Sequence, residues 1–389
     1  MSSRISFLFS SYLLGFGIII PILPIFATQL GANGFIVGII AMSYSLFQFL
    51  FAPFWGNLSD RIGRRPVLLA SILLIAISYL IFAHATTIAI LLVSRIMAGI
   101  GAANISAAQA YISDISAPKD RVKNFGIIGA AFGLGFILGP LIGGIVKDSL
   151  GVPWVGYTAA IFSIFNFILA FILLKESLTN LQTDKPLFTN PLRSMQSDWR
   201  RLPMRRVLTL NFIFLLAFSM MQITATLLWF EHFELSAKHI GYVFAYIGLM
   251  ATVIQGTLLG KLNARFGEKK LLVMGTIFTG IGLLALPYVP IDLFIPLELL
   301  AITCLSIGSA FLNPTLSSVT SQLSLEGSQG KSLGNLQASG SLARTAGPLL
   351  GGYLYDLHYG GPYLIGFLLM GVCTFLAVQL VQKSAFGSH

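Results

Sequence analysis

Apolar segments of about 20 residues recur along nearly the whole chain, and they limit what it can fold into. The hydrocarbon core of a bilayer needs about 20 mostly apolar residues for each spanning helix. This length criterion predicts twelve spanning helices, at 5–29, 35–56, 67–84, 88–111, 124–146, 153–174, 207–230, 238–260, 270–288, 293–316, 331–354 and 361–381. We therefore expect an all-α integral membrane protein.

The composition supports a chain that lies in lipid. Of the 389 residues, 56% are hydrophobic and only 10% are charged, whereas soluble domains carry about 25% charged residues. The 39 glycines suit membrane helices, which pack closely through small residues. The net charge of +10 is dispersed among apolar segments, so we expect no nucleic-acid partner.

One long polar segment, 175–206, divides the helices into two sets of six. The expected domains are an N-terminal six-helix bundle (1–174), a cytoplasmic linker (175–206) and a C-terminal six-helix bundle (207–386). Residues 387–389 are read as a cloning remnant. Cytoplasmic loops of membrane proteins are rich in Lys and Arg. With both termini in the cytoplasm, twenty of the 24 basic residues lie inside, and only Lys147 and Lys238 lie in outer loops. We therefore expect both termini in the cytoplasm.

The two halves repeat each other. GNLSDRIGRRPVLL (56–69) matches GKLNARFGEKKLLV (260–273), GIGAA (99–103) matches SIGSA (306–310), and GPLIGGIVKD (139–148) matches GPLLGGYLYD (347–356). The offsets are 204, 207 and 208 residues. Parallel repeats related about the membrane normal are an architecture of secondary transporters, which bind substrate near the midplane between the repeats.

The loop after the second expected helix contains a glycine-flanked cluster of charges, namely Gly56, Asp60, Arg61, Gly63, Arg64 and Arg65. Gly63 suits a tight turn, and the arginines favour the cytoplasmic side. This segment resembles the signature loop of the major facilitator superfamily, and the resemblance extends over essentially the whole chain. It implies two pseudo-symmetric six-helix bundles that open alternately to either side. The second copy departs from the pattern, because Ala264 replaces the acid and Glu268 an arginine.

Glycines spaced along the fifth expected helix form a second motif, made of Gly135, Gly139, Pro140, Gly143 and Gly144. Glycines four residues apart allow close helix contact, and Pro140 leaves a carbonyl unpaired. The motif is similar to that of the drug–proton antiporter branch of the family, where it implies a seal at the outer end of the bundles and favours export. Simple helix packing is the alternative explanation.

A few polar side chains fall inside expected helices and are candidates for the substrate or proton pathway. Arg95 shares a helical face with Gly99, Ala102, Ser106 and Gln109. Arg344 lies in the second half, and Asn104, Gln222 and Asn313 complete the candidates. A charge inside a membrane is costly and usually faces a cavity or a partner. For Arg95, Arg344 and Glu298, which fall at similar depth, an ion-pair network, a proton site and an anion site all remain open.

Glu298 is the acid placed farthest inside a helix, and it shares a face with Ser306, Ser309 and Asn313. A buried carboxyl there could carry a proton, whereas one close to the outer interface would merely be hydrated. Many proton-coupled drug exporters of this family carry an acid in the first helix. The first helix here has none between Ile5 and Thr28, which weakens the expectation of cation–proton exchange.

These observations predict a secondary transporter, not an enzyme, that exports a small amphipathic or drug-like compound in exchange for protons. Export of one endogenous metabolite, such as a siderophore, and import of an organic anion are the alternatives. HExxH, GxSxG and GxxxxGK[ST] motifs are all absent from the sequence, so an intramembrane enzyme or ATP-driven transport is not expected. We expect no metal and no cofactor. The expected partners are a small-molecule substrate, the lipid bilayer and protons, and the expected state is a monomer in a bacterial inner membrane.

Overall fold

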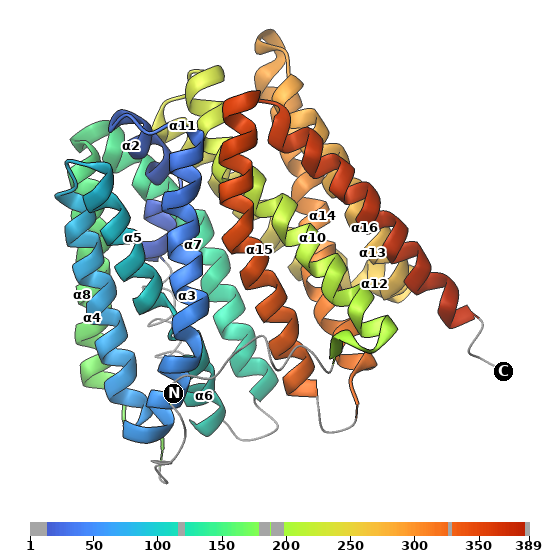
Figure 1. Cartoon of the computed structure of the whole chain (residues 1–389), viewed down its shortest axis with the longest axis horizontal. Helices are drawn as coiled ribbons and strands as arrows, with labels where there is room; N and C mark the ends of the chain where they lie inside the picture. Colours follow the sequence, from blue (N-terminus) through green and yellow to red (C-terminus); the bar gives the residue numbers. More distant parts are fainter. Residues whose placement is uncertain (1–13, 116–120, 179–186, 188–197, 326–328, 386–389) are drawn as a thin grey trace. The chain divides into compact units, whose positions relative to one another are not determined.

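The computed structural model describes residues 14–115, 121–178, 187, 198–325 and 329–385 (Figure 1). In the first half these residues form α2 (Ile22–Gln29), α3 (Gly34–Ile62), α4 (Arg64–Ala83), α5 (Ile88–Ala102), α6 (Ile105–Ile115), α7 (Arg121–Leu150) and α8 (Val152–Leu173). The described part of the chain contains no β-strand.

The second half begins with α10 (Leu202–Leu227), which continues as a π-helical turn, η2 (Leu228–His232). It goes on with α11 (Ala237–Val253), η3 (Ile254–Leu258), α12 (Leu259–Phe266), α13 (Glu268–Ala285), η4 (Leu286–Tyr288), η5 (Ile291–Leu293), α14 (Phe294–Leu323), α15 (Gln329–Leu357) and α16 (Gly361–Ala385).

The predicted fold class is confirmed, because these helices occupy the expected spans, with ends that differ by up to seven residues. Nine spans within the described residues are long and apolar enough to cross a membrane. α7 and α15 occupy two further expected positions as helices of 30 and 29 residues. The first expected helix, 5–29, lies partly outside the described residues. The span expected at 88–111 is interrupted, since α5 ends at Ala102 and α6 begins at Ile105.

Single glycines make two of the sharpest connections. Gly63 alone separates α3 from α4, with a φ of 103°, and Gly267 alone separates α12 from α13, with a φ of 75°. Side-chain-bearing residues rarely adopt such angles, whereas glycine does so at little cost. The two glycines occupy matching positions in the repeated loop, so the repeat in sequence is also a repeat in backbone conformation.

Packing divides the chain into two compact units. The first comprises residues 1–32, 43–190 and 234–248, and the second comprises 33–42, 191–233 and 249–389. The start of α3 therefore belongs with the C-terminal helices, and the start of α11 belongs with the N-terminal ones. A division of the sequence into contiguous halves does not foresee this exchange.

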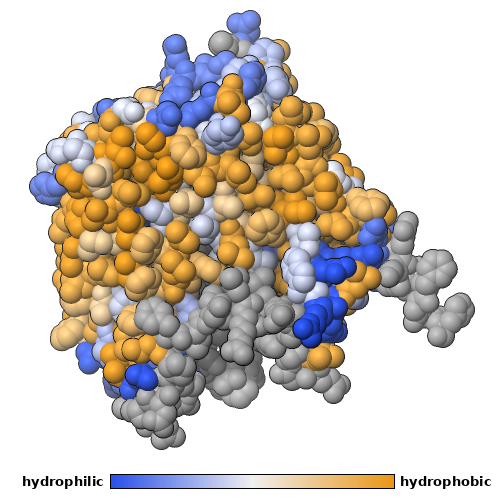
Figure 2. Space-filling view, viewed as in Figure 1, coloured by the Kyte–Doolittle hydropathy of each residue, from blue (hydrophilic) through white to orange (hydrophobic). Residues whose placement is uncertain are grey.

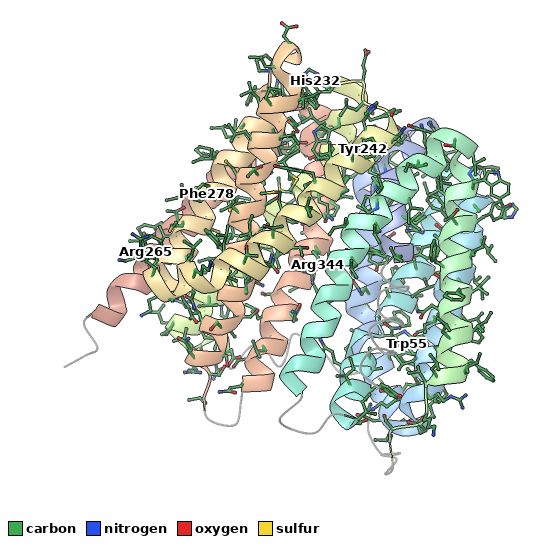
Figure 3. The ribbon with its side chains drawn as sticks, turned by 180° about the vertical axis from the view of Figure 1, so that it is seen from behind. Trp55, His232, Tyr242, Arg265, Phe278 and Arg344 are labelled. Carbon is green, nitrogen blue, oxygen red and sulfur yellow. The ribbon has the colours of Figure 1, made fainter. Side chains whose placement is uncertain are left out.

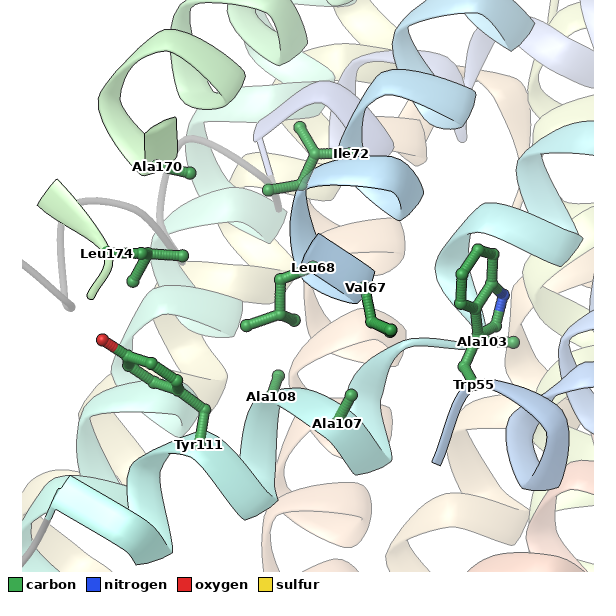
Figure 4. Packing of buried hydrophobic residues seen from close by; sticks show 10 residues of the cluster. All are labelled: Trp55, Val67, Leu68, Ile72, Ala103, Ala107, Ala108, Tyr111, Ala170 and Leu174. Carbon is green, nitrogen blue, oxygen red and sulfur yellow. The ribbon is translucent and has the colours of Figure 1, made fainter. Parts of the chain in front are cut away.

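In the first unit, α4 packs against both α5 and α8. Apolar side chains fill the space where these helices approach α3 and α6, as Figure 4 shows for Trp55, Leu68 and Tyr111. The small side chains of Ala103 and Ala108 leave room for these larger neighbours. The indole Nε1–H of Trp55 donates to the Ile100 carbonyl at 2.6 Å, which satisfies its polar atom inside the apolar cluster.

In the second unit, α13 packs between α14 and α16, and α10 packs against α15 and α16. Large apolar side chains point away from the packed faces in both units, for example Ile172 on α8 and Phe375 on α16, which are 69% and 62% exposed. Figure 2 shows hydrophobic side chains over much of the visible face of the helices. Such surfaces suit contact with lipid.

Candidate functional site

The signature loop is organised around the buried guanidinium of Arg64. Its Nη1 lies 2.5 Å from Oδ1 of Asp60, four residues earlier at the end of α3, and 2.6 Å from Oγ of Ser59. Its Nε lies 3.3 Å from Oδ2 of Asp114, at the end of α6. Arg64 is 8% exposed, so it is largely shielded from water and bonded to two carboxylates. Charge-assisted bonds of this kind are stronger than bonds between neutral groups.

Glu176, just beyond α8, caps the start of α4. Its carboxylate accepts hydrogen bonds from the backbone N–H groups of Arg64, at 2.8 Å, and Arg65, at 3.1 Å. It also accepts the N–H groups of Ser177 and Leu178. Partial burial alone would raise the pKa of Glu176, but the four N–H donors together lower it below its ordinary value. A side chain at Gly63 would collide with this carboxylate, which gives Gly63 a second reason to be glycine.

The second copy of the loop is held together by neutral partners. Glu268 occupies the position of Arg64 and accepts hydrogen bonds from Oγ of Ser318, at 2.6 Å, and Nε2 of Gln322, at 2.9 Å. Ala264, in place of the acid, offers no carboxylate for an ion pair. The charge pattern of the first copy is therefore replaced by an acid that binds an alcohol and an amide.

The glycine motif of α7 lies between two neighbouring helices. Gly139 contacts the backbone of Gly17 and Ile18, with 2.6 Å between its hypothetical Cβ and the Gly17 Cα, and Gly143 contacts the Ile18 carbonyl. Gly144 faces the other way, against the backbone of Ala237 at the start of α11. None of these three positions has space for even a methyl group, so the predicted close contact is present in this structure.

The matching glycines of α15 make equivalent contacts in the second unit. Gly347 meets Oγ of Ser219 on α10, and Gly351 meets the Met220 backbone at 2.9 Å from a hypothetical Cβ. Gly352 meets the carbonyl of Gly34 at the start of α3. Each repeat therefore places one glycine-rich helix between the first helix of its own set and a helix from the opposite set.

Arg95 is buried on α5, with 3% of its surface exposed. Its guanidinium carbon lies 5.2 Å from the ring centre of Phe82 and 5.9 Å from that of Tyr79, both on α4. Its Nε donates to Oγ of Ser94 at 3.3 Å, whereas Nη2 is buried without a hydrogen-bond partner among the described residues. Aromatic faces stabilise a cation, but an unbonded guanidinium nitrogen retains capacity for an acceptor.

The remaining candidates of the first unit lie around the break between α5 and α6. Asn104 is buried at the break, and its Nδ2 donates to Oγ of Ser71 on α4 at 2.5 Å. Nε2 of Gln48 on α3 donates to the Ala102 carbonyl, at the end of α5, at 3.2 Å. Gln109 is exposed on α6. Asn104 therefore holds the break in place, and Gln109 is the accessible candidate.

Glu298 lies in the second turn of α14 and is 1% exposed. Its Oε1 accepts the indole N–H of Trp229 from η2 at 2.5 Å, while its Oε2 is buried without a partner among the described residues. The fully buried Tyr363 of α16 interacts with it electrostatically. No ion pair joins Glu298 to an arginine or lysine within the described part of the chain. Of the two positions considered for Glu298, this structure has the buried one.

The other candidates of the second unit are less deeply placed. Arg344 is half-buried partway along α15, where Figure 3 shows it, and its Nη2 donates to Oγ of Ser341 at 3.3 Å. Gln222 is half-buried on α10, and Asn313 is exposed on α14, where its amide donates to the Ser309 carbonyl at 3.2 Å.

Comparisons with known proteins agree with this architecture. A sequence model described as Major Facilitator Superfamily matches residues 5–289 and 251–385. The class C tetracycline resistance protein of Escherichia coli is 33% identical over 373 residues, covering 92% of this chain and 91% of that protein. Multidrug resistance protein 2 of Bacillus subtilis (strain 168) is 31% identical over 376 residues, covering 95% and 92% of the two chains.

Solved structures agree as well. The crystal structure of the human organic anion transporter MFSD10 (TETRAN) matches with a TM-score of 0.72 and 26% identity, covering 97% of this chain and 98% of the other. Together with the repeated glycine motifs and the signature loop, these matches show that the chain belongs to the major facilitator superfamily and is a multi-pass membrane transporter of a small-molecule substrate.

Proposed function

We propose that this transporter exports a small amphipathic or drug-like compound in exchange for protons, through alternating access of two six-helix bundles. The names of the relatives above support this direction, since resistance to tetracycline and to several drugs is the property for which they are named. The close-packed glycine motif of α7, which is similar to that of drug–proton antiporters, supports it further.

Proton coupling rests on one observation, the buried carboxyl of Glu298. Burying an ionised carboxylate without a neighbouring cation costs several kcal/mol of desolvation free energy. Trp229 supplies one hydrogen-bond donor to Oε1, and Oε2 remains without a partner in the described residues. A proton on this carboxyl removes the charge, so Glu298 is the proposed proton carrier. Release of the proton would require a conformation in which the Glu298 carboxylate is exposed to water.

We propose that the loops at Arg64 and Glu268 face the cytoplasm of a bacterial inner membrane, with both termini on that side. The distribution of lysine and arginine supports this orientation. The Gly34 end of α3 and the Asp148 end of α7 would then face outward. Each chain carries both bundles, so the proposed working unit is a monomer.

The experiment is flux into and out of proteoliposomes, with and without an imposed pH gradient, using tetracycline as the first probe and lipophilic cations next. Glu298→Gln should abolish gradient-driven flux and retain substrate exchange, because glutamine resembles the protonated acid. Asp292→Asn is the matched control, since Asp292 is an exposed acid on η5. Gradient-driven flux at the normal rate in Glu298→Gln would exclude Glu298 as the proton carrier.

A second candidate is transport of an organic anion. The observation that favours it is the buried Nη2 of Arg95, which has no hydrogen-bond partner among the described residues. The human relative is named for organic anion transport. The same proteoliposomes loaded with aromatic carboxylates test this alternative. Anion transport predicts a saturable flux of these carboxylates that Arg95→Gln abolishes. The absence of any such flux with the wild-type protein would reject this alternative.

A further inference from the structure

Two aspartates at matching ends of the repeats cap helices of the opposite repeat. Asp356 is the next-to-last residue of α15, and its Oδ1 accepts the backbone N–H of Gly34 at 2.7 Å. Its Oδ2 accepts the N–H of Phe35 at 2.8 Å. These are the first two residues of α3, so one carboxylate satisfies both of the first free N–H groups of that helix.

Asp148 has the same position in the first repeat. It lies near the end of α7, and its Oδ2 accepts the backbone N–H of Lys238, in the first turn of α11, at 2.9 Å. The Nζ of Lys147 lies 3.4 Å from its other oxygen. The two aspartates close the repeated segments GPLIGGIVKD and GPLLGGYLYD, at an offset of 208 residues.

Each of the two helix starts also has a cap from its own segment, which binds a different N–H group from any that the aspartate binds. The Oδ1 of Asn33 accepts the N–H of Ile36, and Oγ of Ser236 accepts the N–H of His239. These are ordinary N-caps, which bond an N–H two or three residues into the helix. The aspartates bond N–H groups that precede those. The starts of α3 and α11 therefore have a cap of their own and, in addition, a carboxylate from the other repeat.

The glycine rows bring the carboxylates within reach. Gly352 touches the Gly34 backbone one turn before Asp356, and Gly144 touches the Ala237 backbone one turn before Asp148. The N-terminus of a helix carries partial positive charge, which favours an anion there. Backbone contact and charge attraction thus act at the same place in both repeats.

We propose that Asp148 and Asp356 form a pair of electrostatic latches, and that both must release when this end of the two repeats separates during transport. The paired arrangement makes the latches interdependent: losing one cap favours the separated state, in which the other cap is also broken. The inference rests on the proposed alternating access, but it holds for any substrate or driving ion and does not depend on proton coupling at Glu298.

Hydrogen exchange measured by mass spectrometry on the purified full chain tests the latches. The variants are Asp148→Asn, Asp356→Asn and the double variant, with Asp292→Asn as control. Each single variant should raise exchange about two- to fivefold at both helix starts, 34–38 and 237–241. Exchange at 58–66, the opposite end of α3, should fall, because opening at one end accompanies closure at the other.

A purely local cap gives a different result. Exchange would rise only at the helix that lost its carboxylate, with no change at the other cap or at 58–66, and that outcome would overturn the proposal. Asp148→Glu and Asp356→Glu are controls for misfolding: they keep the negative charge, so they should exchange more like the wild type than the asparagine variants do. Retention of normal exchange at both starts in the double asparagine variant would also reject the latches.

Discussion

Arg64 connects parts of the chain that local spacing cannot connect. Asp60 lies only four residues before Arg64, so its role beside Arg64 is predictable from the motif. Asp114 and Glu176 lie 50 and 112 residues further along, and only folding brings them to Arg64. The same holds for Trp229, which is 69 residues before Glu298. The sequence identifies the charged members of each cluster, but their partners depend on helix packing.

Asp60→Asn should cut transport severely while leaving expression and membrane insertion largely intact. The change removes one of the two carboxylates that bind the Arg64 guanidinium, at a cost of about 1–3 kcal/mol in stability. Transport in proteoliposomes and melting temperature measure the two effects. Undiminished transport in a fully inserted variant would show that the loop only orients the protein.

Glu176→Gln should lower the melting temperature at neutral pH, with an effect that disappears in acid. The pKa of Glu176 lies below its ordinary value of 4.5, so its ionised form stabilises the folded state. That stabilisation is complete above about pH 4.5 and is lost as the pH falls through the lower folded value. Melting curves of both proteins between pH 7 and pH 3 should therefore converge. A constant difference across this range would exclude the charge as its cause.

The lengths of the apolar segments predict the helices. The places where the observed helices differ from the expected spans have physical causes. α5 and α6 are separated where Asn104 bonds to Ser71, a contact between helices that apolar length does not report. The glycine spacing of α7 predicts close packing on one face. It does not reveal that Gly139 faces Gly17 while Gly144, five residues later, faces Ala237.

Gly139→Leu or Gly143→Leu should weaken the contact of α7 with residues 17 and 18. Overpacking of this kind typically costs about 1–3 kcal/mol. In a variant without Cys304 and Cys373, a single cysteine at Ala32, buried here, should be alkylated faster when either leucine is present. Gly371→Leu is the control, because no atom lies within 4 Å of a Cβ at that position. Equal alkylation in all variants would refute a sealing role for this motif.

At the scale of the molecule, the repeat in sequence predicts two related sets of six helices, and the family assignment confirms that architecture. The expected domain limits, 1–174 and 207–386, stay a prediction. Packing assigns residues 33–42 and 234–248 to the unit of the opposite repeat. Both of these segments contain the helix starts that Asp356 and Asp148 cap, so these hydrogen bonds help to explain why each segment packs with the other repeat.

Reporter fusions test the proposed orientation of the whole chain. A green fluorescent protein at either terminus should fluoresce, because both termini are expected in the cytoplasm. Alkaline phosphatase inserted after Asn33 or Gly360 should be active, because both connections would face outward. Active phosphatase at the chain ends, with none at these two loops, would reverse the orientation.

The contacts of the glycine rows have a consequence for turnover rate. At Gly144 against Ala237, and at Gly352 against Gly34, backbone lies directly on backbone. Interdigitated side chains would have to leave and re-enter staggered rotamers each time such a surface parted and re-formed. Here the glycines contribute no rotamers to reorder, so little side-chain entropy is lost when the surfaces meet again. We therefore expect these two contacts to part and re-form without a side-chain repacking step.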